Sequence, residues 1–284
     1  MPGSHASSAR RLTASVVFTT YNQPEWLHKV LLGFATQTRS DFELIVADDG
    51  SGPETRAVVE SMRGSLRVEV QHLWQADEGF RKCAILNKAL CAARAPYVIV
   101  TDGDCIPRAD FVDTHLRHRA PGRFLSGGYF KLSMSLSRAI APADITSGRC
   151  FELAWLRAHG LPSDLRSRTR LGMGRFGAAV LDRVMQARTT WNGHNASGWM
   201  KDLRAVNGFD ERMGYGGEDV ELGERLQRIG VTGKRIRYRA PVLHLDHPRA
   251  YDQPEVRAIN EAIRARGRDE QSIWTPHGIE KREA

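Results

Sequence analysis

The stretch from Tyr97 to Ile106, Y-V-I-V-T-D-G-D-C-I, decides the predicted fold. Its first residues are rich in β-branched side chains and predict a buried strand, which runs directly into Asp102, Gly103 and Asp104. Ligands bind at the carboxyl ends of strands in α/β sheets. Two carboxylates separated by a glycine suit a hard divalent cation that is shared with phosphate oxygens. A solvated turn is the competing interpretation, because about one Asp-x-Asp is expected by chance in a chain of this length.

Strand and helix patterns alternate through the residues before this stretch. The predicted strands cover residues 15–20, 42–47 and 67–73, and the predicted helices begin near residues 24, 53 and 81. This alternation predicts an α/β fold with a largely parallel central sheet flanked by helices. Thr19, Tyr21 and Asp49 follow two of the strands, at the same edge of the sheet as Asp102 and Asp104. We therefore expect a nucleotide site at this edge.

The pattern loosens between residues 108 and 188. Residues 124–132 predict a strand interrupted by a glycine pair, and residues 150–159 predict a helix. We interpret a basic, glycine-containing stretch as a mobile loop; its arginines are Arg166, Arg168, Arg170 and Arg175. Glycines 172, 174 and 177 match the G-x-G-x-x-G of dinucleotide-binding proteins. Nicotinamide binding is nevertheless not expected, since no buried strand precedes them and no acid follows about twenty residues later.

The nine residues from Trp191 to Trp199, W-N-G-H-N-A-S-G-W, combine turn-forming residues with two tryptophans. Such a composition is typical of an irregular core loop or of the wall of a sugar site. We favour the sugar site and expect Asn195 and Trp199 to contact an acceptor.

Two carboxylates, Glu218 and Asp219, open a helix that is predicted to end at Gly230. Acids at a helix N-terminus interact well with the helix dipole, which is a purely structural explanation. The glycine pair before them also allows a substrate to approach closely. Of two adjacent carboxylates, one can bind the substrate while the other acts as a general base. His244 and His247 follow the last predicted strand, where they complete a metal site or cap a surface turn.

The composition is that of a globular protein, with 41% hydrophobic and 26% charged residues. No apolar run is long enough to span a bilayer and no signal peptide is recognisable, so a cytosolic location is the simplest expectation. The net charge of +8 favours anionic ligands. Nucleic acid is not expected, because the basic residues are not interleaved with aromatic ones. The four cysteines show no metal-binding spacing and are interpreted as reduced thiols.

Five motifs in this order resemble the inverting GT-A glycosyltransferases of the family 2 type. They are V-V-F-T-T-Y-N, V-A-D-D-G-S, F-R-K-C-A-I-L-N-K-A, T-D-G-D and G-Y-G-G-E-D. The second half, from Asn207 to Leu226, is similar to the carboxyl-terminal galactosyltransferase-type module of bacterial chondroitin-polymerase-like enzymes and of β-1,4-galactosyltransferases. The resemblance covers residues 14–250 and implies a GT-A fold with a Rossmann-like sheet.

The resemblance implies a UDP-sugar donor and a divalent metal, Mn²⁺ or Mg²⁺. The donor-binding positions it implies are Thr19, Tyr21, Asp49, Arg81, Asp102 and Asp104. Asp49 would accept from the uracil ring and Asp102 would hold the ribose. Asp104 would coordinate the metal, with His244 as the second protein ligand and His247 as its alternative.

For the acceptor, the resemblance implies that Asp219 is the catalytic base and that Glu218 binds an acceptor hydroxyl. Tyr215 would stack on the acceptor at a position where relatives often have Trp, which leaves the acceptor's identity open. The implied reaction moves a hexose or N-acetylhexosamine to a glycan or glycolipid, such as lipopolysaccharide or another bacterial surface polysaccharide. A non-catalytic sugar-nucleotide-binding protein of the same fold and a nucleotidyltransferase are the alternatives.

The expected organisation is one GT-A domain between two terminal segments. Residues 1–13 form a flexible arm, residues 14–125 the nucleotide-sugar half, residues 126–250 the acceptor and catalytic half, and residues 251–284 a helical tail. The tail helix has Val256, Ile259 and Ile263 on one face, which we expect to pack on the domain. Its basic side could contact an anionic membrane, which would place the protein at the inner face of that membrane.

Overall fold

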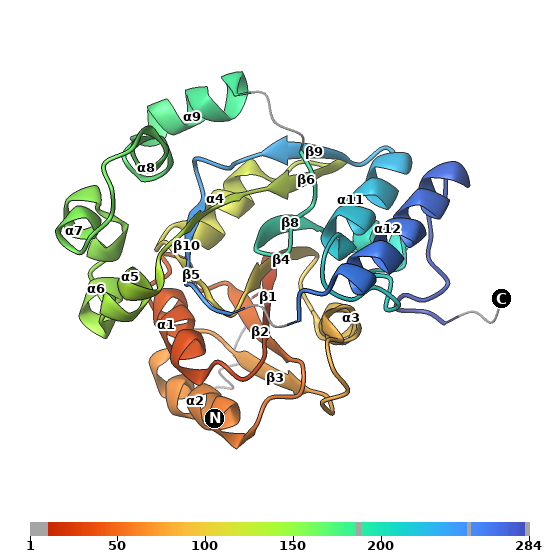
Figure 1. The fold of residues 1–284 in the computed structure, drawn as a ribbon, viewed down its shortest axis with the longest axis horizontal. Helices are drawn as coiled ribbons and strands as arrows, with labels where there is room; N and C mark the ends of the chain where they lie inside the picture. The colour runs from red at the N-terminus through yellow and green to blue at the C-terminus, as the bar shows by residue number, and fades with distance from the viewer. Residues whose placement is uncertain (1–10, 186–188, 249–250, 282–284) are drawn as a thin grey trace, which may run out of the picture.

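The computed structural model describes residues 11–185, 189–248 and 251–281. Its centre is a seven-stranded sheet in the order β3-β2-β1-β4-β8-β6-β9 (Figure 1). The strands are β1 (Ala14–Thr20), β2 (Phe42–Asp48), β3 (Val70–Trp74), β4 (Tyr97–Asp102), β6 (Arg123–Ser126), β8 (Asn195–Trp199) and β9 (Thr232–Arg235). Within the described residues, β8 is the one strand of this sheet that runs antiparallel to its neighbours, β4 and β6. The prediction of a largely parallel sheet is therefore confirmed.

The first strands are buried on both faces, as their β-branched runs predict. In β1, Val16 and Phe18 face one hydrophobic core, while Val17 between them faces a second core. Helices cover both faces, and those of the sheet region are α1 (Pro24–Ala35), α2 (Pro53–Met62), α3 (Lys82–Ala92), α4 (Phe111–His118), α10 (Met200–Ala205) and α11 (Glu218–Arg228), with a 3₁₀ turn η1 (Arg63–Ser65) after α2. The predicted helices near residues 24, 53 and 81 are all present.

A second, three-stranded sheet lies beside the first, in the order β5-β10-β7. Its strands are β5 (Cys105–Pro107), β7 (Gly128–Lys131) and β10 (Pro241–His244). The single strand predicted over residues 124–132 is thus two strands, β6 and β7, which belong to different sheets. Gly127 separates them at a point where a Cβ would lie only 1.9 Å from the Asn195 side-chain oxygen.

The segment between β7 and β8 is a run of short helices along one side of the molecule (Figure 1). They are α5 (Met134–Ala139), α6 (Pro142–Thr146), η2 (Arg149–Phe151), α7 (Leu153–Ala158), α8 (Leu165–Leu171) and α9 (Arg175–Val184). The expectation of a mobile basic loop over Arg166, Arg168, Arg170 and Arg175 is wrong, because these arginines fall within α8 and at the start of α9. Of the glycines in this stretch, Gly172 and Gly174 lie between α8 and α9, and Gly177 lies inside α9.

The last helix, α12 (Pro254–Asp269), packs on α11 and on the turn before it. The Asn260 side chain is buried, and its Nδ2 donates to the carbonyls of Gly214 and Gly216 at 3.0 and 2.9 Å. The predicted apolar face is only partly buried, because Ile259 is 57% exposed whereas Ile263 contacts the core. None of the helices in the described residues has the length and apolar character required to cross a bilayer.

Candidate functional site

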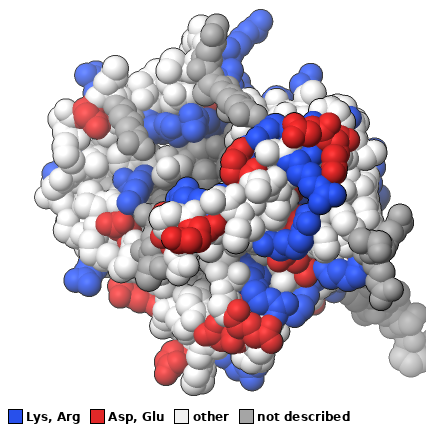
Figure 2. All heavy atoms as spheres, turned by 45° about the vertical axis from the view of Figure 1, so that its right-hand side comes forward, with Lys and Arg blue, Asp and Glu red and all other residues white. Residues whose placement is uncertain are grey.

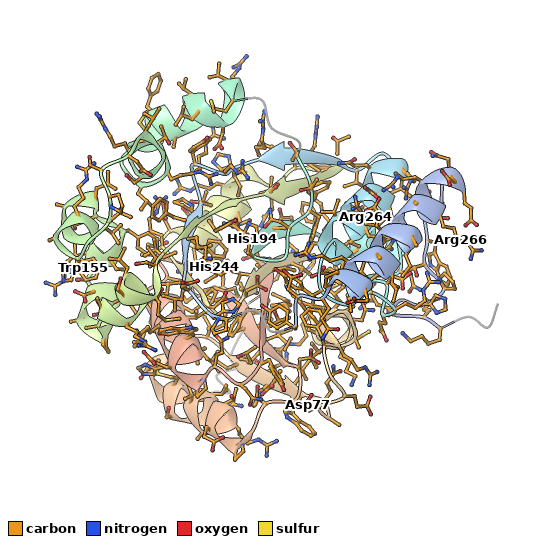
Figure 3. The ribbon with its side chains drawn as sticks, viewed as in Figure 1. Asp77, Trp155, His194, His244, Arg264 and Arg266 are labelled. Carbon is orange, nitrogen blue, oxygen red and sulfur yellow. The ribbon has the colours of Figure 1, made fainter. Side chains whose placement is uncertain are left out.

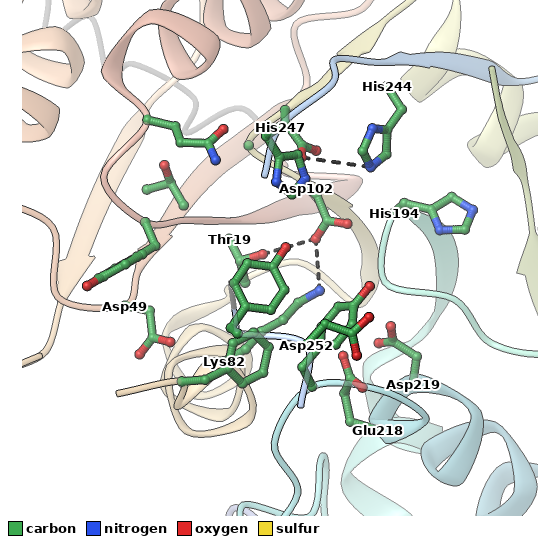
Figure 4. Close-up of a pocket in the computed structure, with 18 of the residues that line it drawn as sticks. Thr19, Asp49, Lys82, Asp102, His194, Glu218, Asp219, His244, His247 and Asp252 are labelled. Carbon is green, nitrogen blue, oxygen red and sulfur yellow. Dashed lines mark hydrogen bonds and ion pairs between the residues drawn. The ribbon is translucent and has the colours of Figure 1, made fainter. Parts of the chain in front are cut away.

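A cavity of about 770 Å³ opens where the first strands of the large sheet end. Nine residues predicted from the sequence line it: Thr19, Tyr21, Asp49, Asp102, Asp104, Tyr215, Glu218, Asp219 and His244. They come from β1, β2, β4, β10 and the start of α11, so the fold brings together side chains up to 225 positions apart in the chain (Figure 4).

One end of the cavity holds Asp104, His244 and His247. The pairing of β10 with β5 places His244 opposite Cys105, directly beside Asp104. His247 Nε2 lies 2.9 Å from Asp104 Oδ2, and His244 Nε2 lies 3.8 Å from the same oxygen. The sequence left open which histidine would join Asp104, and the structure places both beside it.

The tautomers of the two histidines suit metal binding. In each ring Nδ1 lies 2.8 Å from a backbone carbonyl, that of Leu245 for His244 and that of Pro248 for His247. A carbonyl can only accept, so Nδ1 carries a proton, and Nε2, which faces Asp104, is the nitrogen that would bind a metal after losing its own proton. Ligand atoms bound at about 2.1 Å and at right angles lie about 3 Å apart, which matches the 2.9 Å between His247 and Asp104, whereas His244 at 3.8 Å would have to move closer. One carboxylate and two imidazoles held in this way fit a divalent cation.

The electrostatics of Asp104 agree with this arrangement. Burial by itself would raise the pKa of Asp104, but the hydrogen bond from His247 and the charges of His244 and His247 lower it to about 2. The carboxylate is therefore ionised across the physiological range.

Asp102 lies next to the candidate cation site of Asp104, His244 and His247 and is held by two neighbours. Thr19 Oγ1 donates to Asp102 Oδ1 at 3.0 Å, and Lys82 Nζ lies 2.9 Å from the same oxygen. Burial disfavours the charged ammonium, but Asp102, Asp219 and Glu218 outweigh it and raise the pKa of Lys82 well above its ordinary value. Lys82 was missed as a site residue from the sequence, although it lies inside the F-R-K motif. The sequence did contain one indication: Lys82 begins α3, the helix that follows β3, and so lies at the edge of the sheet where ligands bind.

Another part of the cavity wall is formed by Tyr21 and Asp49, an aromatic ring and a carboxylate that together suit a planar ligand ring. The Tyr21 ring is 47% exposed, and its hydroxyl donates to Asp77 at 2.8 Å. Asp49 is buried and accepts from Gln75 Nε2 at 2.6 Å and from the Arg81 backbone N–H at 2.9 Å. Burial raises the pKa of Asp49 despite these hydrogen bonds. The Arg81 side chain does not line the cavity; it forms an ion pair with Glu78 instead.

The two acids of α11 lie on the side of the cavity away from Asp49 (Figure 4). Gly216 and Gly217 precede them with φ of 105° and 96°, values that favour glycine, and the Gly216 N–H donates to Glu218 Oε2 at 2.8 Å. Glu218 is thereby fixed by the turn.

Asp219 is the unusual member of this pair. Its Oδ1 is buried and has no hydrogen-bond partner among the described residues. Burial raises the pKa of Asp219 to about 7, and the negative charges of Glu218 and Asp102 add to the effect, while Lys82 opposes it. A Cβ at Gly193 would lie 2.6 Å from Asp219 Oδ2, so a side chain there would push the carboxylate from its position. A buried carboxylate with a pKa near neutrality and an unused oxygen is suited to accept a proton.

Aromatic side chains border the acids. The rings of Phe80, Tyr215 and Tyr251 contact one another, with centroids 4.8 to 5.9 Å apart, and all three line the cavity. Tyr215 therefore lines the cavity, and its stacking on an acceptor stays a prediction. Phe80 and Tyr251 were not predicted, and Tyr251 comes from the tail.

Asn195 and Trp199 do not reach the cavity, although they were predicted as acceptor contacts. Asn195 is fully buried, and its Nδ2 donates to the carbonyls of Gly128 and Ala240. Trp199 packs edge-on against Tyr97 and donates to the Ala120 carbonyl at 3.0 Å. The residue of this stretch that does line the cavity is His194, whose ring packs on Tyr129 and whose pKa burial lowers to about 4.

Comparison with known protein families gives two matches. Residues 15–119 match the family described as Glycosyl transferase family 2, and residues 182–248 match the one described as N-terminal domain of galactosyltransferase. Both segments contribute residues to the cavity. Asp102 and Asp104 lie in the first segment, and Glu218, Asp219 and His244 lie in the second.

The relatives found by sequence include two named enzymes. Validoxylamine A glucosyltransferase of Streptomyces hygroscopicus subsp. jinggangensis (strain 5008) is 31% identical over 234 residues, covering 76% of this chain and 52% of that protein. Chondroitin synthase of Pasteurella multocida (strain Pm70) is 25% identical over 283 residues, covering 91% of this chain and 26% of the relative. The chain thus spans about half the length of the first relative and about a quarter of the second.

Solved structures with the same fold are more distant in sequence. Mannosyltransferase PcManGT from Pyrobaculum calidifontis, in complex with GDP-Man and Mn²⁺, has a TM-score of 0.60 at 16% identity and covers 93% of this chain and 65% of its own. S. aureus TarS 1–349, in complex with UDP-GlcNAc, has a TM-score of 0.56 at 19% identity and covers 89% and 66%. These likenesses confirm the predicted GT-A fold. The chain therefore contains a glycosyl transferase family 2 domain at residues 15–119, followed at residues 182–248 by a segment that matches the family described as N-terminal domain of galactosyltransferase.

Proposed function

We propose that this chain is an inverting glycosyltransferase that moves a hexose or N-acetylhexosamine from a UDP-sugar to a hydroxyl of a glycan acceptor. The observation that carries the proposal is the content of one cavity: Asp104, His244 and His247 together could hold a cation, and Asp219 also lines the cavity with an Oδ1 that has no hydrogen-bond partner among the described residues. A donor diphosphate needs the first, and an attacking hydroxyl needs the second.

The residues divide the reaction between them. A divalent metal held by Asp104, His244 and His247 would neutralise the charge that develops on the departing diphosphate. Asp219 takes the proton of the acceptor hydroxyl as its oxygen forms the new bond to the anomeric carbon. The bond from that carbon to the diphosphate breaks on the opposite face, so the configuration inverts in a single displacement. Glu218, held by the Gly216 N–H, orients the acceptor.

The same residues indicate how the nucleotide lies. Tyr21 offers an exposed ring for the base to stack on, and Asp49 is an acceptor beside it for a ring N–H such as that of uracil. Asp102, fixed by Thr19 and Lys82, lies between this wall and the metal-ligating group, where the ribose would be. Of the two structures of similar fold, one contains a GDP-sugar and the other a UDP-sugar. The identity of the donor's nucleobase is therefore tested by experiment below.

Two histidine ligands favour Mn²⁺ over Mg²⁺ at this site. Mg²⁺ prefers an octahedron of oxygen ligands, whereas imidazole nitrogen suits transition metals better. The neighbour that contains Mn²⁺ agrees with this choice.

The acceptor proposed is a bacterial surface glycan such as lipopolysaccharide, used at the inner face of the membrane. We had expected the basic side of α12 to make the membrane contact, but its arginines are paired with acids: Arg257 with Asp252, Arg264 with Glu224, Arg266 with Glu270 and Arg268 with Glu261. Figure 2 shows acidic and basic side chains interspersed on this side of the molecule. Paired charges leave little net attraction for an anionic surface, so α12 is a poor candidate for that role.

Thermal stabilisation by nucleotides tests the donor site. UDP, GDP and CMP are each added with and without Mn²⁺ to the wild type, to Asp104→Ala and to Asp269→Ala, an exposed control carboxylate on α12. A ligand at about 100 times its dissociation constant adds about 2.7 kcal/mol to the stability. We expect stabilisation by UDP that needs the metal, is lost in Asp104→Ala and is kept in Asp269→Ala.

Other outcomes would favour the alternatives. Stabilisation without sugar transfer from any UDP-sugar to any tested glycan would indicate a non-catalytic binding protein. Release of inorganic diphosphate from a nucleoside triphosphate would indicate a nucleotidyltransferase. No response to any nucleotide by folded protein would remove the proposal.

A further inference from the structure

Helix α9 exposes its apolar face to solvent. Phe176, Val180 and Val184 are four residues apart and so lie on one face of the helix. Their side chains are 85%, 44% and 64% exposed. Figure 3 shows the side chains of α9 projecting away from the body of the molecule. An amphipathic helix on a globular protein normally turns this face toward the core.

The outward orientation is fixed by polar contacts on the other face of α9. Ala178 and Asp182 are buried there. Asp182 Oδ1 accepts from the Tyr238 backbone N–H at 3.0 Å, and its other oxygen lies 3.8 Å from Arg239 Nε. Rotating the helix to bury Phe176 would take this carboxylate away from both partners. The apolar face is therefore held outward by the fold.

Other exposed apolar residues lie in the same stretch of sequence. We define the outer apolar face as Leu165, Met173, Phe176, Val180, Val184 and Met185. These six are the majority of the ten large hydrophobic residues that are exposed in the described part of the chain, although they come from 21 consecutive positions. Such a concentration marks an interaction surface, whereas exposed apolar residues scattered singly do not.

The charges around this face are positive. Residues 161–185 contain five arginines, two aspartates and no lysine or glutamate. Of the two aspartates, Asp182 is buried and Asp164 accepts from the Ser167 backbone N–H at 2.7 Å at the start of α8. Arg168 and Arg183 are exposed. Two copies of the chain joined through this face would bring these like charges together, whereas an anionic surface would be attracted to them.

We propose that the outer apolar face docks the protein on an anionic lipid bilayer, with α9 lying in the plane of the interface. An apolar face flanked by arginine is the pattern of helices that bind in this way. The apolar side chains enter the boundary between headgroups and acyl chains, and the arginines remain among the anionic headgroups. This inference goes beyond the proposed transferase activity and does not depend on it.

Vesicle flotation tests the proposal with the full chain. Wild-type protein is mixed with vesicles of phosphatidylcholine alone or with a third of phosphatidylglycerol. The test variant is Phe176→Ser/Val184→Ser, which changes two exposed side chains and so leaves the core intact. The control is Ile259→Ser/Ile273→Ser, which removes exposed apolar residues that lie elsewhere, 57% and 49% exposed.

We expect wild type and control to float with the phosphatidylglycerol vesicles, and the test variant to partition at least tenfold more weakly. Binding should also fall at about 1 M salt, where charges are screened within about 3 Å. Wild-type protein that does not float, or a test variant that floats as well as wild type, would overturn the proposal. A wild-type dimer that the test variant converts to a monomer would also overturn it, because a second copy would then occupy the face. An unchanged melting temperature and far-UV circular dichroism spectrum of the test variant would show that any loss of flotation is not a loss of folding.

Discussion

Replacing Asp219 by Asn should abolish transfer and also remove a pH-dependent loss of stability. The raised pKa of Asp219, about 7, means that the wild type has its base fully available only above that pH. We therefore expect kcat/KM of the wild type to rise with pH through about 7 and then to level off. Asp219→Asn cannot accept the proton, and its kcat should fall by about 10²- to 10⁴-fold with little change in nucleotide binding.

Raising the pH has the opposite effect on stability: activity should rise, whereas the free energy of unfolding should fall. The folded protein holds the Asp219 proton up to about pH 7, whereas an unfolded aspartate releases it near 3.8, a difference of about 3 pKa units. At about 1.36 kcal/mol for each, the wild type loses up to about 4 kcal/mol as the pH rises from 4 to above 7. Asp219→Asn carries no such charge, so it should match the wild type near pH 4 and exceed it near pH 8.

Two charge variants test the physical cause of the shift. Glu218→Gln removes a negative neighbour of Asp219 and should move the rise in kcat/KM to lower pH. Lys82→Met removes the opposing positive charge and should move it to higher pH. The assays are sugar transfer from a radiolabelled donor between pH 5 and 9, and urea unfolding at pH 4 and 8. A wild-type rate that is flat across this range, or two variants that shift in the same direction, would refute the reasoning.

Three further substitutions test other parts of the site. Gly193→Ala puts a Cβ where it would lie 2.6 Å from Asp219 Oδ2, so kcat should fall about tenfold or more while stabilisation by UDP and metal is kept. Asn260→Ala removes the hydrogen bonds to the Gly214 turn and should lower both kcat and the melting temperature; an unchanged kcat would show that α12 does not position the acids. His247→Ala should raise the Mn²⁺ concentration needed for half-maximal stabilisation by UDP about tenfold or more, and no change would remove it from the ligand set.

The amino-terminal half was predictable because its patterns are local. Strands β1, β2 and β4 are long apolar runs, and α1 repeats apolar residues at helical spacing, so neither depends on distant contacts. The edge where these strands end follows from the parallel topology, which is why Asp49, Asp102 and Asp104 were placed correctly in one cavity.

Strand β8 was not predictable, because its sequence N-A-S-G-W has little intrinsic preference for a strand. Its position between β4 and β6 imposes the extended conformation, and buried partners satisfy its polar side chains. Ser197 Oγ lies 2.8 Å from the Tyr97 hydroxyl, and Asn195 Oδ1 lies 3.0 Å from His115 Nε2. Polar residues that looked like a sugar site are therefore part of the core.

The roles of the two key carboxylates also depend on neighbours that lie far away in the sequence. Asp104 follows a strand and Asp219 opens a helix, and neither local pattern distinguishes a metal ligand from a base. Asp104 faces two histidines because β10 pairs with β5 in one register, and a shift of one residue would turn His244 to the other face of its sheet. Asp219 instead faces Glu218 and Asp102, with Lys82 as the opposing cation. Since the two histidines lower the pKa of Asp104 while burial and the acidic neighbours raise that of Asp219, tertiary pairing underlies the two roles that we propose for them.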